Sequence, residues 1–198
     1  MNPDYERLYR GVSHAAWAYI FLYLDINLNT LNILPDFVCY LLLWSAISCL
    51  EGEERDLALL RPLCVLLGVW AGADWVFTLL GSALEGRLLP LDLLISVAAI
   101  YFHFQLFTDL ARLAERYQPP GAALGRRLLG LRTVQTLILT VSFILGYSLS
   151  PNTHLTLPGD SPAGWVVAGL ALAGLLLSLM LMSSLFALRK CFLPPEEA

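Results

Sequence analysis

Charged residues are scarce in this chain, and their scarcity excludes an ordinary water-soluble domain. They make up 14% of the 198 residues, whereas a soluble domain carries about a quarter. Hydrophobic residues reach 58%, and the mean hydropathy is +0.67. Because a chain of this composition lacks enough polar groups to cover a surface in water, the sequence predicts a protein embedded in lipid.

The motifs of several common protein classes are also missing. The chain has no basic arm or face that would follow a nucleic-acid backbone, so we expect no nucleic-acid partner. It has no P-loop, no H-E-x-x-H motif and no G-x-S-x-G elbow, so we assign no catalytic residue. Its four cysteines form no C-x-x-C pair, and three lie in apolar stretches as small hydrophobes. The sequence therefore predicts no metal site and identifies no cofactor.

Long apolar stretches dominate what is present. A helix needs about 20 apolar residues to cross the hydrocarbon layer, because each residue adds about 1.5 Å. Six stretches meet or approach this length, so the sequence predicts an all-α membrane bundle that forms one domain over residues 1–198. The second stretch is short, which suits a small tilt or a locally thinned bilayer. The predicted helices are 8–28, 35–50, 57–80, 90–113, 128–149 and 163–188.

The basic residues predict the orientation of these helices. Of the 12 Lys and Arg residues, all except Arg87 lie at the helix ends that share a side with the N-terminus. Because basic residues accumulate on the cytoplasmic side, we expect both termini there and a multi-pass protein in the plasma membrane. The first residues mix acids with arginines and precede no cleavage site, so we expect the N-terminus to be retained.

The sequence also suggests one helical hairpin repeated three times in parallel. Each odd-numbered predicted helix begins near an arginine, and each even-numbered one begins near Leu-Pro and an aspartate. An aspartate there either caps the free amides of its helix or lines an outward-facing mouth with the other aspartates. Both interpretations stay open. The elements are Leu8-Tyr9-Arg10, Leu59-Leu60-Arg61, Gly130-Leu131-Arg132, Leu34-Pro35-Asp36, Leu89-Pro90-Leu91-Asp92 and Leu157-Pro158-Gly159-Asp160.

Ionisable residues inside the predicted helices are the main candidates for function, because a charge in lipid is costly. Asp74 lies about 20 Å along a helix from Arg61, in the outer half of the membrane. His103 lies eleven residues past Asp92, near the midplane. Each such group either lines an outward-facing polar cavity or pairs with a neighbour to fix helix packing. The predicted ligand-binding residues are Asp25, Asp36, Asp74, Asp92 and His103. The predicted aromatic walls are Trp17, Tyr19, Tyr23, Trp70, Trp75, Tyr101 and Phe104.

Residues 25–34 alternate polar and apolar side chains, which does not suit a helix in lipid. We expect an extended outer segment, whose three asparagines either bind a ligand or satisfy their own turns. This segment, with the element Leu34-Pro35-Asp36-Phe37-Val38-Cys39-Tyr40-Leu41 that follows it, resembles an uncharacterised family of small bacterial multi-pass membrane proteins. The resemblance covers only this element, has Cys39 where a glycine is expected, and implies no activity or site residue.

Three classes of function fit these features. The one we favour is binding or transport of a small solute through the outward-facing polar cavity. The second is an accessory or assembly subunit that docks on another membrane protein through the Gly- and Ala-rich helix 163–188, although those small residues suit packing within the chain better. The third is a membrane enzyme that uses Asp25, Asp74 and His103. The lipid bilayer is the partner that all three share.

Overall fold

The computed structural model describes residues 4–23, 27–28, 31–32, 35–81, 89–148 and 162–193. Within these residues the regular structure is helical, apart from two strands of two residues each, and short turns connect the elements. The helices are α1 (Tyr5–Tyr23), α2 (Phe37–Leu50), the 3₁₀ helix η1 (Arg55–Leu60), α3 (Arg61–Leu79), α4 (Leu89–Tyr117), α5 (Leu124–Ser148) and α6 (Pro162–Lys190). The strands are β1 (Asn27–Leu28) and β2 (Leu31–Asn32).

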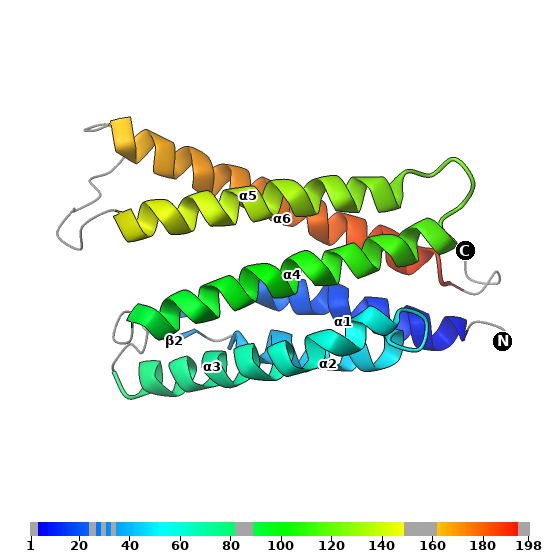
Figure 1. Ribbon diagram of the computed structural model, residues 1–198, viewed down its shortest axis with the longest axis horizontal. Coiled ribbons are helices and arrows are strands. Elements are labelled where there is room, and N and C mark those ends of the chain that lie inside the picture. The colour runs from blue at the N-terminus through cyan, green and yellow to red at the C-terminus, as the bar shows by residue number, and fades with distance from the viewer. Residues whose placement is uncertain are drawn as a thin grey trace.

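The helices form a bundle in which successive helices run in opposite directions (Figure 1). Each α-helix packs on its neighbour in sequence, and α6 packs on α1, so that the contacts close into a ring. The start of α1, the end of α6 and η1 lie at one end of the bundle, which we call the termini end (Figure 1). We call the opposite end, which carries β1 and β2, the hairpin end.

Four helical segments are long and apolar enough to cross a membrane: Arg55–Leu79, Pro90–Tyr117, Leu124–Leu145 and Gly164–Lys190. Large apolar side chains remain exposed on the bundle, and lipid would cover such a surface. These features agree with the predicted helical membrane bundle. Of the six spans that were expected, four are long and apolar enough in the structure. The other two helices fall short because α2 has 14 residues and α1 carries charged residues in its first turns.

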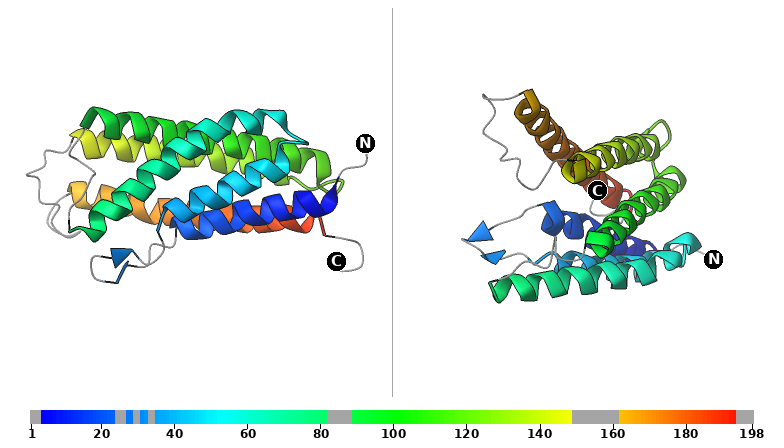
Figure 2. Two further views of the ribbon diagram at one scale, coloured as in Figure 1. Left: turned by 90° about the horizontal axis from the view of Figure 1, so that it is seen from below. Right: turned by 60° about the vertical axis from the view of Figure 1, so that its left-hand side comes forward.

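The first predicted helix ends earlier than expected. It was predicted to reach residue 28, but α1 ends at Tyr23, and β1 pairs with β2 in an antiparallel hairpin. The helix prediction is therefore wrong at this end, because side chains that alternate between polar and apolar suit an extended strand. The hairpin lies beside the bundle, and β2 contacts α3 (Figure 2).

Two glycines let neighbouring helices approach closely at the termini end. A Cβ atom on Gly11 of α1 would lie 2.7 Å from Cγ of Leu50 in α2. A Cβ atom on Gly125 of α5 would lie 2.9 Å from the carbonyl oxygen of Ala111 in α4. Because both distances are shorter than van der Waals contact, a larger residue at either position would push the helices apart.

α6 packs within the bundle mainly along its second half. Leu181, Leu185 and Leu188 are fully buried there. In the first half, Cβ atoms on Gly169 and Gly174 would meet nothing within 4 Å. These two glycines therefore do not serve the close packing within the chain that was expected of the Gly- and Ala-rich start of this helix, because the part of α6 that carries them is mostly exposed.

Candidate functional site

Three of the predicted site residues lie together at the hairpin end. Asp36, Asp74 and Asp92 line one cavity of about 250 Å³ between α2, α3 and α4, with Leu22 of α1 also in its wall. They come from distant parts of the sequence: the residue before α2, the last two turns of α3 and the first turn of α4. We call this cavity the acid pocket.

The side chain of Asp36 does not act as a helix cap. Its backbone is already helical, with φ −58° and ψ −28°, and its carboxylate makes no capping hydrogen bond to α2. A capping aspartate has an extended backbone and accepts from amides of the first turn. The cap interpretation is therefore wrong for Asp36, which lines the acid pocket. Asp160 lies outside the described residues.

Aromatic rings complete the acid pocket. Trp70 of α3 and Tyr40 of α2 line it together with the carboxylates. The rings of Phe37 and Trp75, each next in sequence to one of those aspartates, meet edge to face with centres 5.7 Å apart and join α2 to α3. Among the described residues that line the pocket, none is a lysine or an arginine. The acid pocket thus combines negative charge with aromatic surface.

A second cavity, of about 360 Å³, adjoins the acid pocket and extends toward the middle of the bundle. We call it the inner cavity. The polar residues that line it but not the acid pocket are Tyr23 of α1, His103 of α4 and Gln135 of α5. The Gln135 amide donates a hydrogen bond to the Tyr23 hydroxyl, which connects α5 to α1. The residues that line both cavities are Leu22, Tyr40, Ser96 and Ala99.

α4 explains why the two cavities adjoin. Asp92, Ser96, Ala99 and His103 follow one another at helical spacings of four, three and four residues, so they lie on one face of the helix. Asp92 lines the acid pocket, the two small residues line both cavities, and His103 lines the inner cavity. One face of α4 therefore forms a continuous wall from the hairpin end to the middle of the bundle.

A buried tyrosine holds His103 in place. The Tyr19 hydroxyl lies 2.7 Å from His103 Nδ1, and the two side chains are 0% and 8% exposed. Phe107 packs on the tyrosine ring, and Phe102 packs on the imidazole. The hydrogen bond crosses the interior of the helix ring from α1 to α4 and orients the imidazole in the wall of the inner cavity.

Other predictions for the site have mixed outcomes. Asp25 lies outside the described residues. Of the seven aromatic residues expected in the cavity walls, two line a cavity, namely Tyr23 and Trp70. The other five line neither cavity: Trp17 and Tyr101, which are 48% and 56% exposed, and Tyr19, Trp75 and Phe104. That expectation was wrong because an apolar helix gives no sign of which face points inward.

Two residues that line the cavities, Tyr40 and Ser96, were not predicted from the sequence. Ser96 follows Asp92 by one helical turn, and this spacing could have revealed it.

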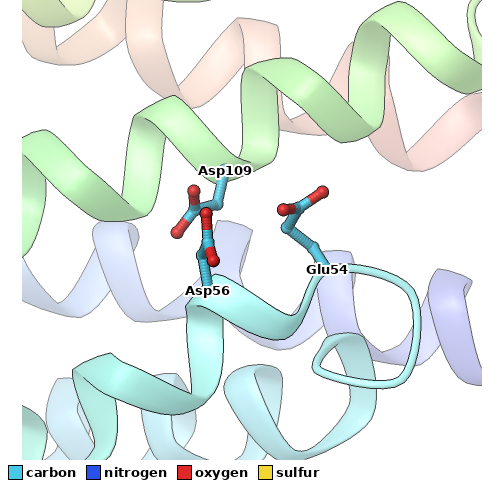
Figure 3. A group of neighbouring side chains, drawn as sticks. All are labelled: Glu54, Asp56 and Asp109. Carbon is cyan, nitrogen blue, oxygen red and sulfur yellow. The ribbon is translucent and has the colours of Figure 1, made fainter.

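A second acidic group lies near the termini end, where Glu54, Asp56 and Asp109 offer carboxylate oxygens within 4.8 Å of one another (Figure 3). Arg112 lies among them, with Nη1 2.7 Å from Asp56 and 3.3 Å from Asp109. The same nitrogen lies 3.6 Å from Glu54, and Arg116 reaches Glu54 at 3.4 Å. The group is therefore an ion-pair network that fastens η1 to α4, and its carboxylates bind arginines.

Comparisons with known proteins assign no family to this chain. No family model, no curated protein and no solved structure matches it. The class of protein that can be stated is a helical bundle with four segments able to cross a membrane. The resemblance around residues 26–41 to small bacterial membrane proteins stays a prediction.

Proposed function

We propose that this membrane protein binds or transports a small solute through the acid pocket and the inner cavity. The observation that carries the proposal is the continuous face of α4, from Asp92 to His103, which both cavities share. Ligand sites are concave, mostly apolar, and contain a few polar groups that converge, usually within about 300–1,000 Å³. Cavities of about 250 and 360 Å³ that adjoin one another fit this description.

In this proposal all six helices cross the membrane, and both termini are cytoplasmic. The alternating directions of the helices support it, because α1 begins at the end where α6 finishes (Figure 1). Basic residues also gather near the termini end, among them Arg112, Arg116 and Arg189. α2 covers only about 21 Å along its axis, which a locally thinner bilayer accommodates. The acid pocket then faces the outside of the cell.

Native mass spectrometry of protein extracted gently from its own membrane tests the proposal. We expect a small molecule bound at stoichiometric occupancy. Asp74→Asn keeps the shape of the side chain but removes its charge, so it should lower the occupancy. Asp56→Asn is the matched control, since it alters a carboxylate near the other end of the bundle.

Folding of each variant is checked by its unfolding temperature. The absence of a bound molecule from the wild-type protein would contradict the proposal. So would an occupancy as high as that of the wild type in both Asp74→Asn and the cavity-filling variant Ala99→Phe. A loss of the molecule in Asp56→Asn as large as the loss in Asp74→Asn would also contradict it, because the effect would then not depend on the acid pocket.

Docking through α6 is a second candidate function, and one observation favours it. Gly169 and Gly174 have open space around their Cα atoms, so another helix could approach α6 closely there. Gly169→Leu should then abolish co-purification of a second membrane protein. Gly130→Leu is the control, because Gly130 of α5 also has nothing within 4 Å of a Cβ atom. A complex that survives Gly169→Leu would exclude this face.

A further inference from the structure

We propose that the inner cavity binds an uncharged, mostly apolar group of the ligand that presents a carbonyl oxygen to the imidazole of His103. Ketones, quinones and esters share this chemistry. The inference rests on the proposed function and names the class of solute. Three observations support it: a buried histidine with an unused donor, a cavity lining without charge, and the place of the cavity in the bundle.

His103 has a hydrogen-bond donor without a partner among the described residues. The Tyr19 hydroxyl is fully buried, and in the described part of the chain its hydrogen-bond partner is His103 Nδ1, 2.7 Å away. A buried hydroxyl that did not donate would leave its proton unsatisfied, so we assign the hydroxyl as donor and Nδ1 as acceptor. A neutral imidazole then carries its proton on Nε2, and no described residue bonds that nitrogen.

This donor belongs to the wall of the inner cavity and is held in a fixed orientation. His103 lines the cavity, although the residue is only 8% exposed. The rings of Tyr19 and Phe102 pack on the imidazole, with centres 5.6 and 5.4 Å from its own. A buried N–H without an acceptor is costly. A ligand atom that accepts from Nε2 removes that cost, and the donor loses little freedom because it is already ordered.

The lining of the inner cavity favours an uncharged acceptor over an anion. Its described residues include no lysine or arginine to balance a negative charge, and no carboxylate to balance a positive one. A carbonyl oxygen accepts a hydrogen bond without a charge and without a donor of its own that needs a partner. Apart from His103, the polar lining residues are Tyr23, Tyr40, Ser96 and Gln135, and the large apolar ones are Leu22, Ile100, Leu139 and Phe143.

The place and the size of the inner cavity favour a lipophilic molecule. His103 lies eleven residues after Asp92, which corresponds to about 16 Å along α4. The donor is therefore far from the hairpin end, in the middle of a membrane bundle, where a charged ligand group would be costly. A volume of about 360 Å³ suits a small organic molecule rather than a single water.

Two uncharged probes of the same shape test the inference. Fluorenone has a carbonyl group where fluorene has a methylene group. Equilibrium dialysis of the full chain, with the same neutral detergent on both sides, measures their affinities for the wild type, His103→Phe, His103→Gln and His14→Phe. His14→Phe is the matched control, because His14 bonds Ser45 at 2.9 Å and lines neither cavity. The unfolding temperature shows whether each variant folds.

We expect the wild type to bind fluorenone about fivefold more tightly than fluorene, since a hydrogen bond between uncharged groups contributes about that factor. His103→Phe should remove this preference and leave the affinity for fluorene nearly unchanged. His103→Gln restores an N–H donor and should recover part of the preference. His14→Phe should keep all of it.

Infrared spectroscopy of fluorenone bound to the wild type gives a readout that needs no variant. A hydrogen bond from Nε2 should lower the stretching frequency of the carbonyl group, compared with fluorenone in the same detergent without protein. This measurement decides the inference if His103→Phe does not fold.

Equal affinity of the wild type for the two probes, or a preference for fluorenone that persists in folded His103→Phe, would overturn the carbonyl inference while solute binding stands. An unshifted carbonyl band would overturn it in the same way. If neither probe binds, the inference fails as well. The molecule retained in native mass spectra then decides separately whether the proposed function holds.

Discussion

Replacing Tyr19 with phenylalanine tests whether the buried tyrosine–histidine pair stabilises the bundle. The substitution removes one oxygen and keeps the ring, whose centre lies 4.9 Å from that of Phe107. It deprives His103 Nδ1 of its partner at 2.7 Å, in a side chain that is 8% exposed. A buried polar group that loses its partner costs about 1–3 kcal/mol. For a chain of this size that corresponds to a fall in Tm of roughly 2–12 °C.

Thermal unfolding in one neutral detergent measures this effect. Tyr101→Phe is the matched control, because it removes the same oxygen from a ring that is 56% exposed, and it should change Tm very little. The double variant with His103→Phe adds a second test. Once the imidazole is gone, Tyr19→Phe should cost about 1 kcal/mol less than it does alone. Equal shifts for Tyr19→Phe and Tyr101→Phe, or an additive double variant, would refute the reasoning.

Two further predictions concern packing and orientation. Gly125→Ala should lower Tm by several degrees, because its Cβ atom would lie 2.9 Å from the carbonyl oxygen of Ala111. Gly130→Ala on the same helix is the control: its Cβ atom would have no neighbour within 4 Å, so the substitution should not lower Tm. Equal shifts in the two variants would argue against the close approach of α4 and α5. In intact cells, a membrane-impermeant maleimide should label Leu80→Cys at the exposed end of α3 but not Gly52→Cys in the turn after α2. The reverse result would invert the proposed orientation.

The sequence predicted the elements whose signal is local. The long apolar runs of α4 and α6 follow from the length needed to cross lipid. The change from helix to extended chain near Asn27 follows from side chains that alternate in polarity.

The sequence could not predict which side chains meet in space. Hydropathy treats all faces of an apolar helix alike, so it could not distinguish the exposed Tyr101 from the cavity-lining His103 two residues later. Tyr40 gave no signal because its place in both cavities depends on how α2 packs between α1 and α3. Asp36 was ambiguous because only the backbone angles and the hydrogen bonds distinguish a cap from a cavity wall.

Chemical modification of Ser96→Cys in intact cells tests the central claim most directly, because Ser96 lines both cavities. An acid-walled cavity open to the outside predicts that a membrane-impermeant cationic thiol reagent reacts there faster than an anionic reagent of similar size. Val97→Cys, the next residue on the outer surface of α4, should not react, because lipid covers it. Modification of Val97→Cys alone, or of Ser96→Cys without any preference for the cation, would contradict the account.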